Sequence, residues 1–297
     1  MNNTSWRHHY IPEFYLKGFT NEENTFKIYD VQRKKFIRNG KDFSTKSYFF
    51  EEDGNTILTD KGADDFIEKG FAEIDNRVSS LFNKVRIADS NTRFGLSEND
   101  MPALQHFVSV LFWRIPSNYD KIKKLIHENE LHEFGLLIKS KLTNETVRDE
   151  ELENKIRNNP SFFKALKLLL PNLTYKRLLD CDTPLTIQTF PKELPALCSD
   201  NPVIFEKSNF PDIYYDDFIF PLTNRHVLIR ANKINPNVPV HIKITIDLIV
   251  LKQANKYVSC TDSKYIGMLE NLFAKQNMTL DKLKEMVFRT LIDSKIK

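Results

Sequence analysis

The chain has 297 residues, of which 43 are basic and 40 acidic, and its formal net charge is +3. This length allows one large domain or two small ones, and a hydrophobic fraction of 41% excludes a disordered chain. So small a net charge does not by itself indicate nucleic-acid binding.

The cysteines and the apolar runs predict the compartment. Cys181, Cys198 and Cys260 lie far apart, with no CxxC pair, which is typical of free thiols in a reducing compartment. The first residues are polar and lack the apolar run of a signal peptide. No stretch approaches the roughly 20 apolar residues of a membrane helix. We therefore expect a soluble, cytoplasmic protein without a membrane partner, and we leave its oligomeric state open.

The first half of the chain alternates short strands with longer helices. Pro12 favours a short helix within residues 10–19, and residues 25–37 predict a hairpin. Apolar residues at steps of three and four then predict helices over residues 64–86 and from Asp100 to before Pro116. Further helices are expected within residues 119–142, 153–158, 161–170 and 172–180.

The pattern changes after residue 180. Strands rich in β-branched and aromatic residues are expected within residues 183–190, 194–200, 218–222 and 226–231. Helices are expected again within residues 246–259, 263–276 and 280–292.

Together these elements predict an α+β fold that is mostly helical. Its small antiparallel sheet is built mainly from residues about 183–230, plus an N-terminal hairpin. We expect a single domain over residues 1–297, and the pattern is compatible with a helical subdomain, residues 62–180, inserted between the hairpin and the C-terminal part.

Two adjacent histidines, His8 and His9, stand in the stretch RHHYIP. Imidazoles transfer protons near neutral pH and ligate metals. Neighbouring residues of a strand point to opposite faces, so one histidine can face a site while the other packs. A structural role for the pair stays open.

The segment His8–Phe19 is rich in aromatics, and we expect it to pack against the helices around Phe71 and Val110.

The two central helices carry charged residues beside their apolar faces. Glu68 and Asp75 are seven residues apart and share one helix face. Arg114 ends the second helix beside Trp113, where it either complements the helix dipole or clamps an anion. The two carboxylates either pair with a base or reach into a cleft, or they belong to a solvated helix face.

The stretch Ser199-Asp200-Asn201-Pro202 interrupts two apolar runs. It predicts either a tight turn or a functional carboxylate, Asp200, at a strand end. No HExxH or CxxC motif is present, so a structural zinc site is not expected. Histidine and carboxylate ligands for a divalent metal ion remain an open alternative.

Three stretches, HHYIPEFYLKGF, SDNPV and FPLTNRHVLI, resemble a bacterial family named domain of unknown function 4238. The matching positions are His9, Tyr10, Pro12, Tyr15, Leu16, Phe19, Ser199, Asp200, Pro202, Val203, Pro221 and Leu222. The resemblance implies no activity. It implies that the N-terminal signature and the Asp200 turn belong to one domain, with Glu68, Asp75 and Arg114 as polar positions of its central helices. Asp75 stands where a glutamate is expected. We therefore expect His9, Asp75, Arg114 and Asp200 to meet in one cleft.

Two hypotheses of function follow, and the sequence does not decide whether the protein is an enzyme. The first is a metal-dependent or His/Asp-based hydrolase, nuclease-like, acting in bacterial conflict or phage defence. Its predicted catalytic residues are His8, His9, Arg114 and Asp200, its binding residues Tyr10, Glu68, Asp75 and Asn201, and its partner nucleic acid. The second is a non-catalytic binding or regulatory module whose polar cluster is a structural network.

Overall fold

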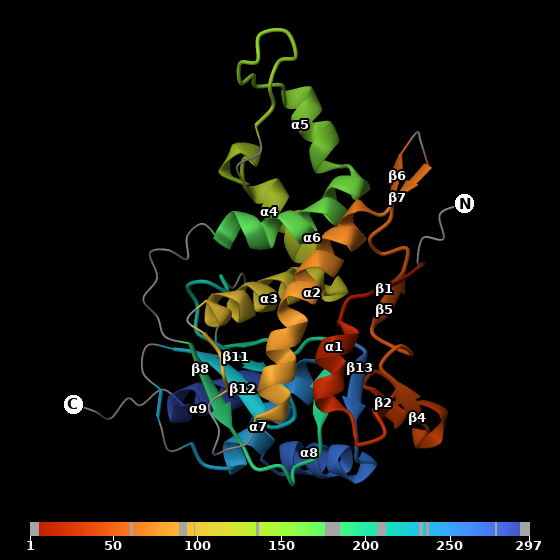
Figure 1. Cartoon of the computed structure of the whole chain (residues 1–297), viewed down its shortest axis with the longest axis vertical. Helices are drawn as coiled ribbons and strands as arrows, with labels where there is room; N and C mark the ends of the chain where they lie inside the picture. Colours follow the sequence, from red (N-terminus) through yellow and green to blue (C-terminus); the bar gives the residue numbers. More distant parts are fainter. Residues whose placement is uncertain are drawn as a thin grey trace, which may run out of the picture.

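The computed structural model describes residues 6–59, 62–88, 94–97, 99–134, 137–175, 185–206, 212–231, 234–235, 238–276 and 278–291. It confirms the α+β class, with long helices on both sides of small antiparallel sheets (Figure 1).

One sheet joins the two ends of the chain. Its strand order is β3–β2–β13–β9, and β4 also pairs with β2. The strands are β2 (Thr25–Asp30), β3 (Lys35–Phe36), β4 (Asp42–Ser44), β9 (Leu197–Ser199) and β13 (Tyr257–Cys260). Val258 of β13 lies opposite Tyr29 of β2 on one side and Ser199 of β9 on the other. The predicted N-terminal hairpin is thus confirmed, and it is completed by strands from the C-terminal half.

A second sheet has the order β10–β11–β12–β8 and comes from the predicted 183–230 region. Its strands are β8 (Leu185–Thr189), β10 (Ile204–Phe205), β11 (Phe218–Pro221) and β12 (His226–Arg230). Two short ribbons stand apart, β1 (Arg7–His9) with β5 (Phe50–Glu52) and β6 (Ile57–Thr59) with β7 (Gly62–Asp64).

The helices follow the predicted periodicity closely. They are α1 (Glu13–Leu16), α2 (Phe66–Ile87), α3 (Asp100–Arg114), α4 (Tyr119–Glu128), α5 (Glu150–Arg157), α6 (Pro160–Tyr175), α7 (His241–Gln253), α8 (Ser263–Gln276) and α9 (Leu280–Leu291). Two predictions were too long. The helix expected over 119–142 ends at Glu128, because Asn129 is extended. The helix expected over 246–259 ends at Gln253, and the chain then forms β13, whose edges pair with β2 and β9.

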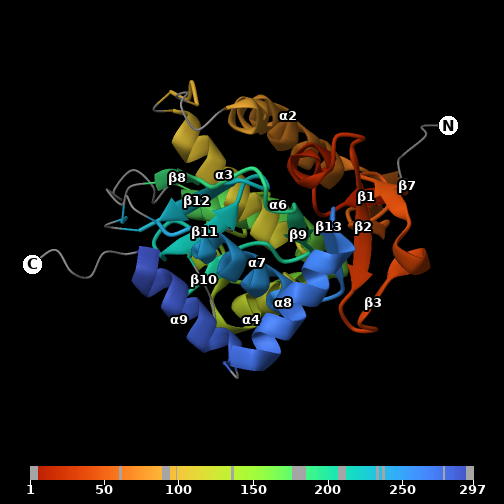
Figure 2. The same ribbon diagram turned by 90° about the horizontal axis from the view of Figure 1, so that it is seen from below.

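Both faces of the second sheet are covered by helices, so β11 and β12 are buried throughout and read as continuous apolar runs. Neighbouring residues of β11, such as Ile219 and Phe220, point to opposite faces and belong to two different hydrophobic clusters. The first cluster holds the N-terminal segment, α2 and α3; the second holds α7, α8 and α9. Figure 2 shows this layering, with α2 and α3 on one side of the strands and α7 to α9 on the other. Helices α4 to α6 extend the molecule at one end (Figure 1).

The N-terminal segment is buried as expected, but against different residues of the same helices. Tyr15 contacts Phe82 of α2, Phe107 of α3 and Phe220 of β11, and its hydroxyl donates to the Pro221 carbonyl at 2.7 Å. Phe71 and Val110, the residues predicted to receive the segment, lie in a separate small cluster with α6.

The predicted free thiols are present where the structure describes them. Cys198 and Cys260 are free and buried on adjacent strands. Cys181 lies outside the described residues, as does the end of the helix predicted over 172–180. No helix in the described part of the chain is long and apolar enough to cross a membrane. The helical subdomain stays a prediction.

Candidate functional site

Strand β1 sends its two histidines to opposite sides, as the period of a strand requires. His8 is buried, and its Nδ1 accepts a hydrogen bond from the backbone N–H of Asn55 at 3.0 Å. His9 packs edge-on against the ring of Phe50, with the ring centroids 5.6 Å apart.

Asn55 extends the contact of His8 to the first turn of α2. Its side-chain amide donates to Oε2 of Glu68 at 2.7 Å. His8, Asn55 and Glu68 therefore form a chain of hydrogen bonds that fixes β1 against this helix, a role that needs no ligand.

An ion pair joins α2 to α3. Nη1 of Arg114 lies 2.9 and 3.2 Å from the two carboxylate oxygens of Asp75, and the guanidinium also lies 4.5 Å from the centroid of the Phe71 ring. Burial raises the pKa of Asp75, while the positive charge of Arg114 acts in the opposite direction.

His9 lies close enough to Arg114 and Glu68 for their charges to change its pKa. Burial lowers the pKa of His9, with Arg114 acting in the same direction, whereas Glu13 and Glu68 raise it. Nε2 of His9 and Nε of Arg114 are buried and have no hydrogen-bond partner among the described residues. We call His9, Glu68, Asp75 and Arg114 the helix cluster.

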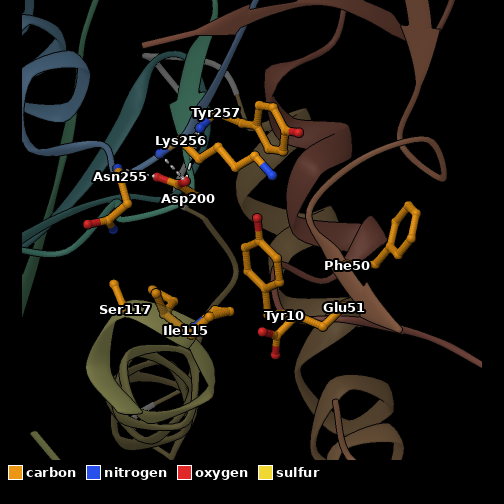
Figure 3. Close-up of a pocket in the computed structure, with 10 residues that line it drawn as sticks. Tyr10, Phe50, Glu51, Ile115, Ser117, Asp200, Asn255, Lys256 and Tyr257 are labelled. Carbon is orange, nitrogen blue, oxygen red and sulfur yellow. Dashed lines mark hydrogen bonds between the residues drawn. The ribbon is translucent and has the colours of Figure 1, made fainter. Parts of the chain in front are cut away.

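The carboxylate of Asp200 is held by three backbone N–H groups. Oδ1 accepts from the N–H of Asn255 at 2.8 Å, and Oδ2 accepts from those of Lys256 and Tyr257 at 2.7 and 3.0 Å (Figure 3). Burial raises the pKa of Asp200, and the three N–H donors counteract that effect. Asn201 acts at the same corner, since its side-chain amide donates to the Gln253 carbonyl at the end of α7 at 3.0 Å.

The four residues that were expected to meet in one cleft lie in two separate places. His9, Asp75 and Arg114 come together, but no hydrogen bond or ion pair between described residues joins any of them to Asp200. Asp200 instead closes the corner between α7 and β13. Tyr10, which follows His9, is the predicted residue that faces Asp200.

A cavity of about 200 Å³ lies beside Asp200. Its walls come from the residue after β1, from β5, from the residues after α3, from the Asp200 turn and from the residues that lead into β13 (Figure 3). The lining residues are Tyr10, Phe50, Glu51, Ile115, Pro116, Ser117, Asp200, Asn255, Lys256 and Tyr257.

Tyr10 brings a polar atom into this cavity. Its side chain is 9% exposed, and its hydroxyl makes no hydrogen bond to another described residue. Burial raises the pKa of Tyr10 well above its usual value, and the carboxylates of Asp200 and Glu51 add to the rise. The phenol is therefore a neutral hydrogen-bond donor at any physiological pH.

The wall beside Tyr10 depends on an unusual backbone conformation. Phe49 is buried and has a φ of 64°, in the left-handed region that a bulky side chain rarely adopts. Its carbonyl accepts the N–H of Tyr10 at 2.9 Å, and the next two residues, Phe50 and Glu51, line the cavity. Strained backbone of this kind is concentrated at functional sites.

Sequence reasoning missed Glu51, Lys256 and Tyr257. The last two were assigned to a helix, and only the pairing of β13 turns them toward Tyr10. The remaining hint was the density of polar and aromatic residues in these stretches.

Within the described ranges, no three His, Cys, Asp or Glu side chains gather as metal ligands, so no metal site is assigned.

Comparison with known proteins gives one match. No curated protein and no solved structure matches the chain. A family model described as "Protein of unknown function (DUF4238)" matches residues 7–265, a stretch that includes both the helix cluster and the cavity. The chain therefore belongs to the DUF4238 family.

Proposed function

We propose that this protein is a non-catalytic binding module of the cytoplasm, in which the predicted site residues form a structural network around a ligand cavity. The observation that carries the proposal is the set of three backbone N–H groups bound to the Asp200 carboxylate. A carboxylate engaged in this way fixes the wall of a cavity and is poorly placed to accept a proton from a substrate or water.

The other polar residues support the same function. His8 and Glu68 are engaged through Asn55, and Asp75 through Arg114. These bonds join β1 to α2 through Asn55, and α2 to α3. Buried hydrogen-bond networks make a structure rigid, and a preformed cavity loses little entropy on binding.

A second candidate is a nuclease-like hydrolase acting in phage defence, with nucleic acid as its partner. It is favoured by His9 and Arg114, whose Nε2 and Nε atoms have no hydrogen-bond partner in the described part of the chain. Because burial lowers the pKa of His9, its imidazole is neutral at pH 7 and can accept a proton. Arg114 would stabilise phosphoryl charge. Both atoms are buried, so substrate access requires the segment around β1 to open.

The test incubates purified protein with RNA and with DNA, in Mg²⁺, in Mn²⁺ and in EDTA. We compare the wild type with His9→Gln and with His127→Gln, a matched change at an exposed histidine. The binding module predicts no cleavage by any of the three proteins. Cleavage that persists in His127→Gln and disappears in His9→Gln, with both variants folded, would establish the hydrolase instead.

A further inference from the structure

Both carboxylates of the cavity already have partners within the protein. Asp200 accepts three backbone N–H groups. The carboxylate of Glu51 lies 3.8 Å from Nζ of Lys167, a lysine that is buried in α6. Neither carboxylate needs a cation from a ligand.

Unlike the carboxylate of Glu51, the ammonium group of Lys256 is not held by an opposite charge from a described residue. Within the described ranges Lys256 has no ionic partner, and its ammonium group lies 4.8 Å from the centroid of the Tyr257 ring. Figure 3 shows this ammonium group and the Tyr10 hydroxyl pointing toward one another from opposite sides of the cavity. Lys256 is exposed and stands at the rim of the cavity. The cavity therefore presents one cation without an ionic partner among the described residues and one hydroxyl that makes no hydrogen bond to a described residue.

We propose that this cavity binds a small organic anion, whose carboxylate or phosphate oxygen is held between the Lys256 ammonium group and the Tyr10 hydroxyl. The inference rests on the binding function proposed above and adds the chemical class of the ligand. Charge-assisted hydrogen bonds of this kind are about twice as strong as neutral ones.

The rest of the lining limits the size of the anion. Ile115, Pro116 and Phe50 supply apolar surface next to the polar pair. The cavity measures about 200 Å³, and an engineered protein cavity of about 150 Å³ binds benzene. The ligand is thus an acid with one ring or a short branched chain, and a polymer such as RNA does not fit inside.

The experiment measures binding of four one-ring probes to the full chain by saturation-transfer NMR and calorimetry. Benzoate and phenyl phosphate carry the proposed anions, whereas benzyl alcohol and benzylamine carry a neutral group and a cation. The variants are Tyr10→Phe, which removes only the hydroxyl, and Lys256→Met. Their matched controls are Tyr29→Phe on β2 and Lys264→Met on α8, neither of which lines the cavity.

We expect at least one anion to bind, and neither benzyl alcohol nor benzylamine. Tyr10→Phe should weaken anion binding about tenfold and Lys256→Met about fivefold, while both controls bind as the wild type does. Preference between benzoate and phenyl phosphate identifies the anionic group. Equal binding of benzyl alcohol or benzylamine, or anion binding that both cavity variants leave unchanged, would overturn the ligand class and leave a binding cavity. Binding of none of the four at millimolar concentration would overturn both the class and the proposed function.

Discussion

Asp200 illustrates how the surroundings of one side chain decide its role. A strand-end carboxylate is equally suited to catalysis and to a turn, and here the N–H groups of residues 255–257 are directed at its oxygens. The turn that the sequence predicts after β9 is therefore also bonded to the residues at the start of β13.

We expect Asp200→Asn to lower the free energy of unfolding by about 1–3 kcal/mol, because the amide nitrogen meets N–H donors and leaves at least one of them unpaired. Urea melts at pH 7 measure the change. Asp120→Asn is the control, since the Asp120 side chain is 93% exposed and its loss should cost less than about 0.5 kcal/mol. Equal stabilities of the two variants would show that the Asp200 bonds contribute little.

At the scale of elements, Gly18 allows the N-terminal segment to approach the second sheet. A Cβ atom at this position would lie 3.2 Å from the Leu222 carbonyl oxygen and 3.2 Å from the Thr223 methyl carbon. The carbonyl belongs to the backbone beyond β11 and cannot move aside easily, and the Gly18 carbonyl itself accepts the N–H of Asn224 at 3.0 Å.

Gly18→Ala should therefore destabilise the protein by about 1–3 kcal/mol through overpacking. Gly267→Ala is the matched change, because a Cβ there meets no atom within 4 Å and the residue lies inside α8. That variant should gain about 0.5–1 kcal/mol from helix propensity. Opposite signs in thermal or urea melts are expected; a stabilising Gly18→Ala would contradict the tight approach.

The whole N-terminal segment acts as part of the core. Tyr15, Leu16 and Phe19 are fully buried between α2, α3 and β11. A chain that lacks residues 1–20 should lose cooperative unfolding, because these side chains fill space that the helices and the sheet cannot close. Tyr15→Phe, which removes the hydroxyl that donates to the Pro221 carbonyl and also bonds to Cys198, should keep cooperative unfolding and lose about 1–2 kcal/mol. A truncated chain with the melting temperature of the full chain would refute this role.

At the scale of the whole molecule, buried histidines set the response to acid. Burial lowers the pKa of His106 and of His226 to about 4. An unfolded histidine takes up its proton near pH 6.5, so the unfolded state binds more protons between about pH 6.5 and 4. The free energy of unfolding therefore falls as the pH falls through this window, by at most about 1.4 kcal/mol per pH unit for each histidine.

Urea melts from pH 7.5 to 4.5 test this linkage. His226→Gln should show a shallower loss than the wild type, and His127→Gln, at an exposed position, should follow the wild-type slope. Burial raises the pKa of Asp75 and Asp200, which favours folding as the pH falls, so the comparison uses the difference between each variant and the wild type. Parallel curves for wild type and His226→Gln would show that this histidine does not titrate differently on folding.

The sequence by itself determined the fold class and most of the elements. The apolar spacing from Phe66 to Ile87 and the Asp100 and Pro116 signals define helices because their causes are local, namely periodicity and the geometry around proline. The alternation of His8 and His9 across a strand is local in the same way. Asn55 and Phe50 could not be predicted as their partners, because these residues meet the histidines only after folding.

Tertiary structure alone decided the end of the helix at Gln253 and the composition of the cavity. The residues of β13 are apolar enough for either helix or strand, and the open edges of β2 and β9 select the strand. That choice turns Lys256 toward Tyr10 and directs three N–H groups at Asp200. A sequence displays which side chains carry charge, but which charges are compensated depends on neighbours that are remote along the chain.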